Sequence, residues 1–252
     1  SIIFWTTHKC ASTYISKFLE LISKESKLKH FDYAGNIWEL GNEIKIKDPF
    51  DIETNCDFLY REYGEIYGPM RTPFDFSLRD KLNNIFFLRD PRDLIISKYY
   101  SIAYSHPEPS NIIVKKEFLK KRYEARKLGI NNFFLKQIDD WIIPHYTKYK
   151  CMRENSRFSS FHKYEDLKDN PKKVFFKITK DMNIDISEKM IDELVKSFEK
   201  PFKDKKNNKL NDIYSHTRSG ENRQFENELS RDILIRGNNK LEDIINYWKF
   251  MM

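Results

Sequence analysis

The first residues that could do chemistry lie in the segment 6–14, which reads TTHKCASTY. Lys9 is followed closely by two hydroxyl side chains, Ser12 and Thr13. A lysine and hydroxyl donors at the start of a helix can bind a phosphate, because free N–H groups and the positive end of the helix dipole attract anions. The alternative is an ordinary capped helix whose lysine is solvated. This segment alone leaves both interpretations open.

A second candidate pair is Arg89 and Ser97, in the segment RDPRDLIIS. Asp90 suits the N-cap of a helix, Pro91 its first position, and Asp93 the favourable end of its dipole. Arg89 just before this helix and Ser97 two turns into it could reach one phosphate, with the guanidinium giving a bidentate contact. The alternative is a capped helix with surface arginines.

The elements that position these residues follow from hydrophobic periodicity. The β-branched and aromatic run 1–6 predicts a strand, and apolar residues from Ser12 onward repeat at helical spacing. The run 85–88, which ends in Arg89, predicts a second strand followed by a helix. Alternating strands and helices predict an α/β fold, a central and mainly parallel sheet flanked by helices, with ligands at the carboxyl ends of its strands.

Further along the chain, Pro144 is expected to end a helix that contains Phe134 and Trp141. The run 158–161 predicts a strand, and Asn170 with Pro171 predicts the start of another helix. Two later apolar stripes predict two more helices, with inward residues Ile191, Leu194, Val195 and Phe198 in one and Leu241, Ile244, Ile245 and Trp248 in the other.

Composition excludes several classes of protein. The 252 residues fit one domain, 1–252, and no apolar stretch approaches the roughly 20 residues that span a bilayer. Cys10, Cys56 and Cys151 are odd in number and widely spaced, which argues against a disulfide framework or a zinc site and favours a reducing, cytoplasmic location. The net charge of +7 is compatible with nucleic acid, an anionic surface or a small polyanion.

Together, these segments resemble the sulfotransferase family, which has a P-loop-like fold. The family patterns T-x-P-K-[ST]-G-[ST]-[ST]-W and R-[ND]-P-x-D-x-x-x-S correspond to 6–14 and 89–97, in the family's order. The segment 218–225, RSGENRQF, resembles the late loop R-K-G-x-x-G-D-W. The segment 164–171, which begins YEDL and ends NP, resembles the family's Y-E-D-L-x-x-N-P. Four elements in order cover most of the chain.

The resemblance implies transfer of a sulfuryl group from 3′-phosphoadenosine 5′-phosphosulfate (PAPS) to a hydroxyl or amine by in-line displacement, leaving PAP (adenosine 3′,5′-bisphosphate) and needing no metal. Lys9 is the implied catalytic residue. The residues implied to hold the 5′ end and adenine are Lys9, Cys10, Ala11, Ser12, Thr13, Tyr14 and Tyr164, and those at the 3′-phosphate are Arg89, Ser97, Arg218, Ser219 and Gly220. The chain departs from the family patterns at His8, Cys10, Ala11, Tyr14 and Arg223.

The general base is not assigned by the resemblance. Many family members supply a histidine about twenty residues before the arginine that binds the 3′-phosphate, and the corresponding segment 67–73 has none. The candidates are Asp32, Glu39, Glu62, Glu65 and His106. Arg71 could contact an anionic acceptor but cannot act as a base.

The expected partner is a small-molecule or carbohydrate acceptor, with no nucleic acid and no membrane for the visible chain. Three alternatives stay open. A P-loop kinase or hydrolase would need GxxxxGK[ST], which is absent. A nucleic-acid-binding protein would need basic and aromatic residues on one surface, whereas the basic residues here are dispersed among acids. An inactive homologue would bind PAPS or PAP without transferring the sulfuryl group.

Overall fold

The computed structural model of the protein describes residues 1–33, 57–206 and 221–250. The chain divides into two compact units. Unit 1 consists of Ser1–Arg89 and Lys148–Lys200, and unit 2 of Asp90–Thr147 and Pro201–Met252. The single domain expected over 1–252 stays a prediction.

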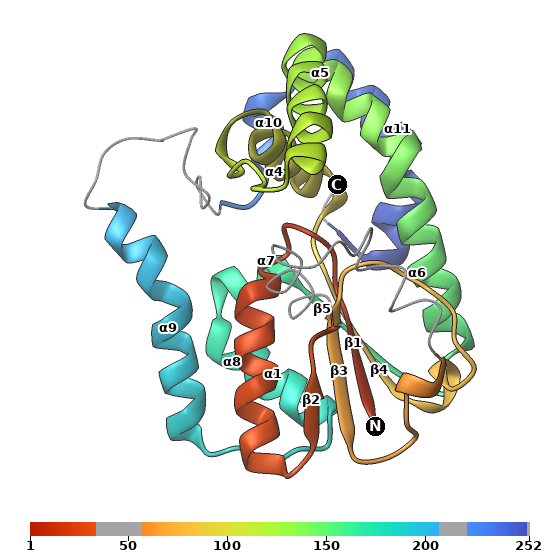
Figure 1. The fold of residues 1–252 in the computed structure, drawn as a ribbon, viewed down its shortest axis with the longest axis vertical. Coiled ribbons are helices and arrows are strands. Elements are labelled where there is room, and N and C mark those ends of the chain that lie inside the picture. Colours follow the sequence, from red (N-terminus) through yellow and green to blue (C-terminus); the bar gives the residue numbers. More distant parts are fainter. Residues whose placement is uncertain (34–56, 207–220, 251–252) are drawn as a thin grey trace. The chain divides into compact units, whose positions relative to one another are not determined.

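Unit 1 is built on a five-stranded sheet with the strand order β2-β3-β1-β4-β5 (Figure 1). All four strand pairs are parallel. The strands are β1 (Ile2–Trp5), β2 (Lys29–Phe31), β3 (Glu65–Met70), β4 (Asn83–Leu88) and β5 (Phe158–Lys163). The expected parallel α/β fold is therefore confirmed, and the strands that begin near Ile2, Asn83 and Phe158 lie where the sequence predicts them.

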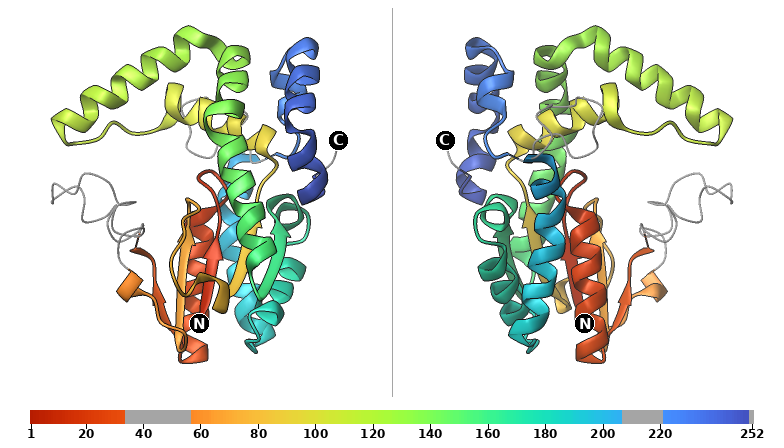
Figure 2. Two further views of the ribbon diagram at one scale, coloured as in Figure 1. Left: turned by 90° about the vertical axis from the view of Figure 1, so that its right-hand side faces the viewer. Right: turned by 90° about the vertical axis from the view of Figure 1, so that its left-hand side faces the viewer.

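Helices cover both faces of this sheet. On one face, α1 (Ser12–Ser26) and α8 (Pro171–Asp181) lie side by side, with the rings of Phe18 and Phe175 4.8 Å apart (Figure 2). On the other face, Tyr149 from α6 (Ile143–Asn155) packs edge-on against Trp5 and Phe86. Trp5 and Phe86 are register partners in β1 and β4, so one aromatic layer joins the two central strands to α6.

The remaining helices of unit 1 follow β5 directly. They are α7 (Tyr164–Asp169), α8, and α9 (Glu188–Lys206), which extends beyond the unit. Asn170 caps α8 as expected, since its side chain accepts a hydrogen bond from the amide of Lys173 at 3.0 Å. Short 3₁₀ turns, η1 (Asp57–Leu59) and η2 (Arg79–Lys81), precede β3 and β4.

Unit 2 is helical. Its elements are α4 (Pro91–Tyr100), a π-helical turn η3 (Ser101–Ser105), α5 (Ile112–Gln137), a second π-helical turn η4 (Ile138–Ile142), α10 (Phe225–Glu228) and α11 (Arg231–Trp248). In α11, Gly237 lies directly against the ring of Phe134, where a side chain would find no room. This close approach joins α11 to α5.

The expectation that Pro144 ends a helix is wrong. The helical path continues through η4 into α6, with Pro144 at the second position of α6. Pro144 directly follows the π-helical turn, where the hydrogen-bond spacing along the helix changes, so the helix passes the missing N–H without ending. The helical periodicity between Phe134 and Ile142 therefore predicted a helix correctly, but the predicted end of that helix was wrong.

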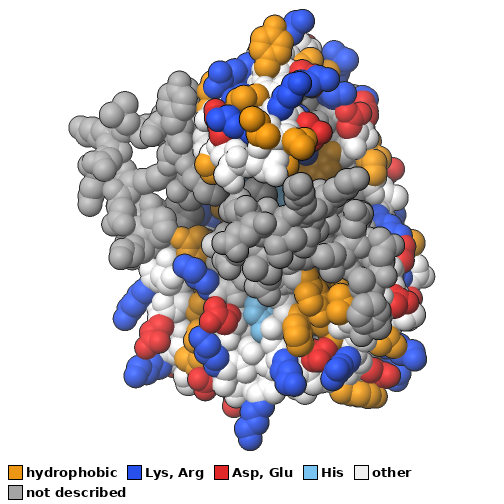
Figure 3. Space-filling view, viewed as in Figure 1, with side chains coloured by type: hydrophobic (Ala, Val, Ile, Leu, Met, Phe, Trp, Pro, Cys, Tyr) orange, Lys and Arg blue, Asp and Glu red, His pale blue; other side chains and the backbone are white. Residues whose placement is uncertain are grey.

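Charge is mixed over the surface of unit 1. On the face drawn in Figure 3, blue Lys and Arg side chains of this unit are interspersed with red Asp and Glu side chains. Ion pairs such as Lys24–Glu20 and Lys172–Glu188 account for part of this pattern. A continuous basic face, which nucleic-acid binding would favour, is not seen among the described residues of this view.

Candidate functional site

The carboxyl ends of the parallel strands bring several predicted residues of unit 1 to one edge of the sheet. The segment 6–11 follows β1, Arg89 follows β4, and Tyr164 follows β5. Arg71 follows β3, and Asp32 follows β2. Because all five strands run in the same direction, these residues lie at the same edge, where open α/β sheets bind ligands.

The backbone of the first loop has an unusual course. Lys9 and Ala11 both have positive φ, at 68° and 52°. Ala11 is the N-cap of α1 and supplies no side-chain hydrogen bond, although its carbonyl accepts from the amides of Tyr14 and Ile15. The amides of Ser12 and Thr13 have no carbonyl one turn earlier in the helix to bind, so they are available to an anion.

Cys10 fixes this loop to the sheet. Its side chain is fully buried, and its thiol donates to the carbonyl of Phe87 in β4 at 3.5 Å. Burial raises the pKa of Cys10 to about 12, so the sulfur stays a neutral thiol. Cys10 therefore positions the loop with its side chain and offers only its backbone to a ligand.

Arg89 connects the loop to the start of α7. Its Nη1 donates to the carbonyl of Lys9 at 3.1 Å, and its guanidinium lies 4.5 Å from the centre of the Tyr164 ring. Arg89 is only 4% exposed. The structure thus brings Lys9, Arg89 and Tyr164 together, and one face of Tyr164, the residue expected near adenine, is occupied by Arg89.

Lys9 has an altered acidity. Burial, and secondarily the positive charge of Arg89, lowers the pKa of Lys9 to about 8. Two cations held close together in a partly buried site attract an anion, because a bound anion relieves both the desolvation and the repulsion. This is the electrostatic pattern expected of a phosphate or sulfate site.

Sequence reasoning missed Tyr149, which also holds the loop. Its hydroxyl donates to the carbonyl of Thr6, and its ring packs on Trp5. No motif contains Tyr149, and its position follows only from the pairing of α6 with the sheet. A buried tyrosine on a core helix was therefore the only available signal.

Arg71, at the end of β3, is a further cation at this edge of the sheet. Its Nε is enclosed and has no hydrogen-bond partner among the described residues. An enclosed guanidinium N–H without a partner costs free energy, which a bound anion would recover. The position agrees with the expectation that Arg71 could meet an anionic group.

The candidates for a general base lie in different places. The carboxylate of Asp32 accepts a hydrogen bond from Ser16 of α1 at 2.6 Å, and Asp32 lies at the carboxyl edge. Glu65 begins β3 and Glu62 precedes it, so both lie at the amino edge, away from Lys9. His106 belongs to unit 2, and Glu39 lies outside the described residues.

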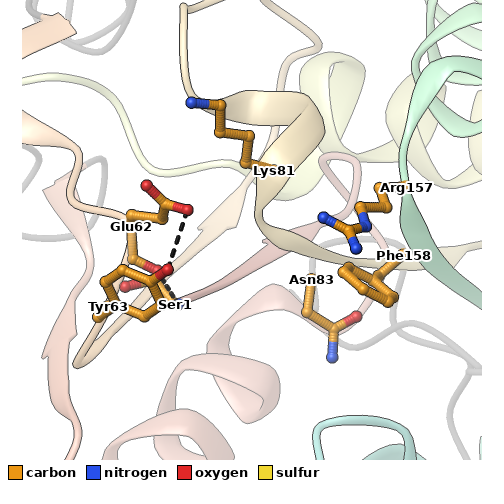
Figure 4. A pocket seen from close by; sticks show the side chains of 7 residues that line it. All are labelled: Ser1, Glu62, Tyr63, Lys81, Asn83, Arg157 and Phe158. Atoms are coloured by element: carbon orange, nitrogen blue, oxygen red, sulfur yellow. Dashed lines mark hydrogen bonds between the residues drawn. The ribbon is translucent and has the colours of Figure 1, made fainter.

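A cavity of about 440 Å³ lies at this amino edge. It is lined by Ser1, Glu62, Tyr63, Lys81, Asn83, Arg157 and Phe158 (Figure 4). Its lining residues include the first residue of β4 and the first of β5. The cavity is therefore at the end of the sheet opposite the Lys9 loop and does not include any residue predicted to bind the donor.

Unit 2 holds the other predicted contacts. Ser97 lies in α4, and Asp93 in the first turn of the same helix accepts hydrogen bonds from the amides of Arg223 at 2.7 Å and Phe225 at 3.3 Å. The end of the late loop is thus attached to the helix that carries Ser97. The predicted residues Arg218, Ser219 and Gly220 lie outside the described residues.

Arg92 reinforces this attachment. It pairs with Asp90 at 2.6 Å, donates to Asn238 of α11 at 3.0 Å, and stacks its guanidinium 4.1 Å from the ring centre of Phe225. Arg92 is 1% exposed, so it is not a surface arginine. Its role is to join α4, α10 and α11 of this unit.

We expect replacement of Ala11 by glycine to stabilise the protein. Ala11 holds a left-handed conformation with φ 52° and ψ 27°, which costs a residue with a Cβ about 1 kcal/mol relative to glycine. The free energy of unfolding, measured by urea denaturation, should therefore rise by about 1 kcal/mol. Ala125→Gly, at a buried helical position of α5, is the control and should lower it by about 1 kcal/mol. A loss of stability in Ala11→Gly would contradict the assigned conformation.

Two observations limit the kinds of site that the described residues form. In the described ranges, no group of three His, Cys, Asp or Glu residues is arranged to hold a metal ion. Across these same residues, no helix combines the length and apolarity needed to cross a membrane.

Comparisons with known proteins identify a family and a fold. The family model described as "Sulfotransferase domain" matches residues 1–242. Among solved structures, mouse sulfotransferase SULT7A1 complexed with PAP superposes with a TM-score of 0.59 at 16% identity, over 97% of this chain and 83% of its own. Retinol dehydratase with androsterone and PAP gives 0.57 at 15%, over 99% and 82%, and its complex with retinol and PAP gives 0.55 at 14%, over 99% and 82%.

No curated protein sequence matches the chain. The structural likenesses, at such low identity, establish the fold, whereas the match over residues 1–242 establishes the family. The expected enzyme class is confirmed, because the chain is a sulfotransferase and belongs to the sulfotransferase domain family.

Proposed function

We propose that the chain takes the sulfuryl group from PAPS and transfers it by in-line displacement to a hydroxyl or amine, leaving PAP. The observation that carries the proposal is the contact of Arg89 with the carbonyl of Lys9, at 3.1 Å. It joins the two most specific motifs, 6–14 and 89–97, at the ligand-binding edge of the sheet. The PAP in the structures of the mouse sulfotransferase and retinol dehydratase supports the same donor.

The residues present fit a donor with a phosphate at each end. The amides of Ser12 and Thr13 begin α1 without a side-chain cap and would hold the 5′ end together with Lys9. Arg89 would meet the 3′-phosphate, and Ser97 would add a hydroxyl. The positions of Arg218, Ser219 and Gly220 in the late loop, and a single domain over 1–252, belong to the same proposal.

Adenine contacts are proposed for two aromatic residues. Tyr14 is partly exposed in the first turn of α1, where the Nζ of Lys17 lies 6.0 Å from its ring centre, and it is the proposed stacking partner of adenine. Tyr164 is 5% exposed and already supports Arg89. Tyr164 would therefore contact adenine with the edge of its ring and would also orient Arg89. Tyr14 would stack on adenine with the face of its ring.

Bound PAPS supplies an activated sulfuryl group on a phosphate leaving group. Lys9 holds a positive charge beside that phosphate, and the loop amides add fixed dipoles, so charge is stabilised where it increases during transfer. Arg71 would neutralise the group being transferred. Among the candidates for the base that the structure describes, Asp32 is the carboxylate at this edge and is proposed as the base, with Ser16 orienting it.

The acceptor is proposed to be a small molecule. The complexes of retinol dehydratase contain androsterone or retinol, which have hydroxyl groups, so the fold accommodates such compounds in a relative. Carbohydrates and amines remain within the proposed class of acceptor, since no described residue of this chain selects among them.

A calorimetric titration of PAP against ADP tests the donor. We expect PAP to bind at least tenfold more tightly than ADP. The reason is that Arg89 and the other residues proposed at the 3′-phosphate would bind a group that ADP lacks. Equal affinities would overturn the assignment. Tighter ADP binding that required magnesium would identify the kinase alternative, and PAP binding without transfer to any acceptor would identify an inactive homologue.

A further inference from the structure

The first part of α5 carries an exposed apolar stripe. Ile112, Leu119 and Tyr123 are 81%, 39% and 67% exposed, and their spacing of seven and four residues places them on one side of the helix. Ile113 and Val114 extend the exposed apolar surface at the helix start. We call Ile112, Leu119 and Tyr123 the α5 stripe.

Basic residues border this stripe. Lys116, Lys120 and Lys127 are exposed and follow one edge of it by helical spacing. The two acids of this part of the helix, Glu117 and Glu124, project to a different side. Where Figure 1 shows α5, Figure 3 shows orange hydrophobic side chains beside blue basic ones.

The flank of the stripe away from these lysines is already used by the fold. The ring of Phe118 packs at a tilt against that of His106, with centroids 5.4 Å apart, and Arg122 donates to the carbonyl of Ile102 at 3.0 Å. Arg126 donates to the carbonyl of Ala103 at 2.7 Å. Because this flank is anchored to η3 and the segment after it, the helix presents the α5 stripe and its lysine edge to a partner.

Gly129 sets this part of α5 apart from the rest. Its backbone is not helical, with φ 68° and ψ 166°, so the helix bends at this residue. Figure 2 shows the part before the bend (yellow-green) extending away from the remainder of unit 2. An apolar stripe on an extended helix can touch a flat surface along its whole length.

We propose that the first part of α5 docks the protein on an anionic lipid surface. An apolar stripe bordered by lysines is the pattern of helices that lie in the membrane interface, with apolar side chains among the acyl chains and lysines at anionic headgroups. A flat bilayer needs only the α5 stripe and its lysine edge, whereas a protein that wraps a basic helix would also need the anchored flank. The proposal departs from the expectation of no membrane partner and is independent of the donor site.

Sedimentation with lipid vesicles tests this docking. We expect the protein to bind vesicles of phosphatidylcholine mixed with phosphatidylserine, but not phosphatidylcholine alone, and to be released by salt. Lys116→Gln/Lys120→Gln/Lys127→Gln should weaken binding roughly 100-fold, since each basic residue near an anionic surface contributes about a factor of five. Leu119→Gln/Tyr123→Gln should weaken it by at least tenfold.

Matched variants separate docking from general charge and hydrophobicity. Lys173→Gln/Lys180→Gln/Lys189→Gln removes three exposed lysines of unit 1, and Ile235→Gln removes an apolar side chain of α11 that is 52% exposed. Both should bind vesicles like the unaltered protein. Thermal unfolding followed by circular dichroism should show that all four variants are folded.

Three results would overturn the proposal. One is the absence of binding to any vesicle, and another is equal weakening by the α5 lysine variant and the unit 1 lysine variant. The third is a dimer in analytical ultracentrifugation that Leu119→Gln/Tyr123→Gln dissociates, which would make a second copy of the chain the occupant of the α5 stripe.

Discussion

Replacement of Arg89 by alanine is expected to weaken PAP binding about 100-fold, or about 3 kcal/mol. The guanidinium of Arg89 is buried, is held by the carbonyl of Lys9 at 3.1 Å, and lies over Tyr164. A phosphate bound there would gain two parallel N–H donors from a side chain that is already in place. Isothermal titration calorimetry with PAP measures the loss directly.

Two further variants separate the causes of this loss. Arg89→Lys keeps the charge but loses the planar fork, so it should recover only part of the affinity. Arg79→Ala removes another buried arginine of unit 1, which pairs with Asp75 and Asp80 before β4. It should lower stability and leave the PAP affinity of the folded protein unchanged. Arg89→Ala with unaltered PAP affinity would contradict the assigned role.

The sequence predicted the parts of the fold in which local signals and packing agree. The strand at Ile2–Trp5 is followed by a helix with regular apolar spacing, and both are found as expected. Asn170 and Pro171 mark the start of α8 because capping is a local interaction. The strands β2 and β3 were not predicted, since the three residues of β2 carry no pattern and Gly68 and Pro69 interrupt that of β3.

The sequence predicted the site residues that belong to a motif and act directly through their own side chains. Lys9 and Arg89 lie at one edge of the sheet because both follow parallel neighbouring strands, as ligand residues of an α/β fold are expected to do. The support around them was not predictable. Tyr149 reaches Thr6 from 143 residues away, and its role depends on which helix packs on which face of the sheet.

Glycine positions of the family patterns show how far the motifs constrain the backbone. Ala11 and Arg223 replace these glycines, and both have positive φ, at 52° and 60°. The surrounding contacts hold the left-handed conformation despite the Cβ. For Arg223, these contacts include the hydrogen bond from its amide to Asp93 and the pairing of its side chain with Glu226. The departures in sequence therefore preserve the local shape.

Replacement of Lys9 by alanine is expected to lower kcat by about 100-fold to 1,000-fold, as for the loss of one fixed group that stabilises the charge of a transition state. The pKa of Lys9 is lowered to about 8 in the free protein, mainly by burial and secondarily by Arg89. Raising the pH through about 8 thus removes the charge of Lys9 in the free protein. A bound anion favours the charged form, so PAP binding takes up a proton in this range.

The affinity of the unaltered protein for PAP should consequently fall as the pH rises above about 8, with a limiting slope of about tenfold per pH unit. Lys9→Ala should bind more weakly at low pH and show no such decline. Lys9→Arg keeps its charge throughout this range, so it should bind PAP with no decline and thereby separate the charge from its titration. A decline that persists in Lys9→Arg would assign the titration to another group. An affinity of the unaltered protein that does not change on either side of about pH 8 would show that Lys9 does not meet the anion.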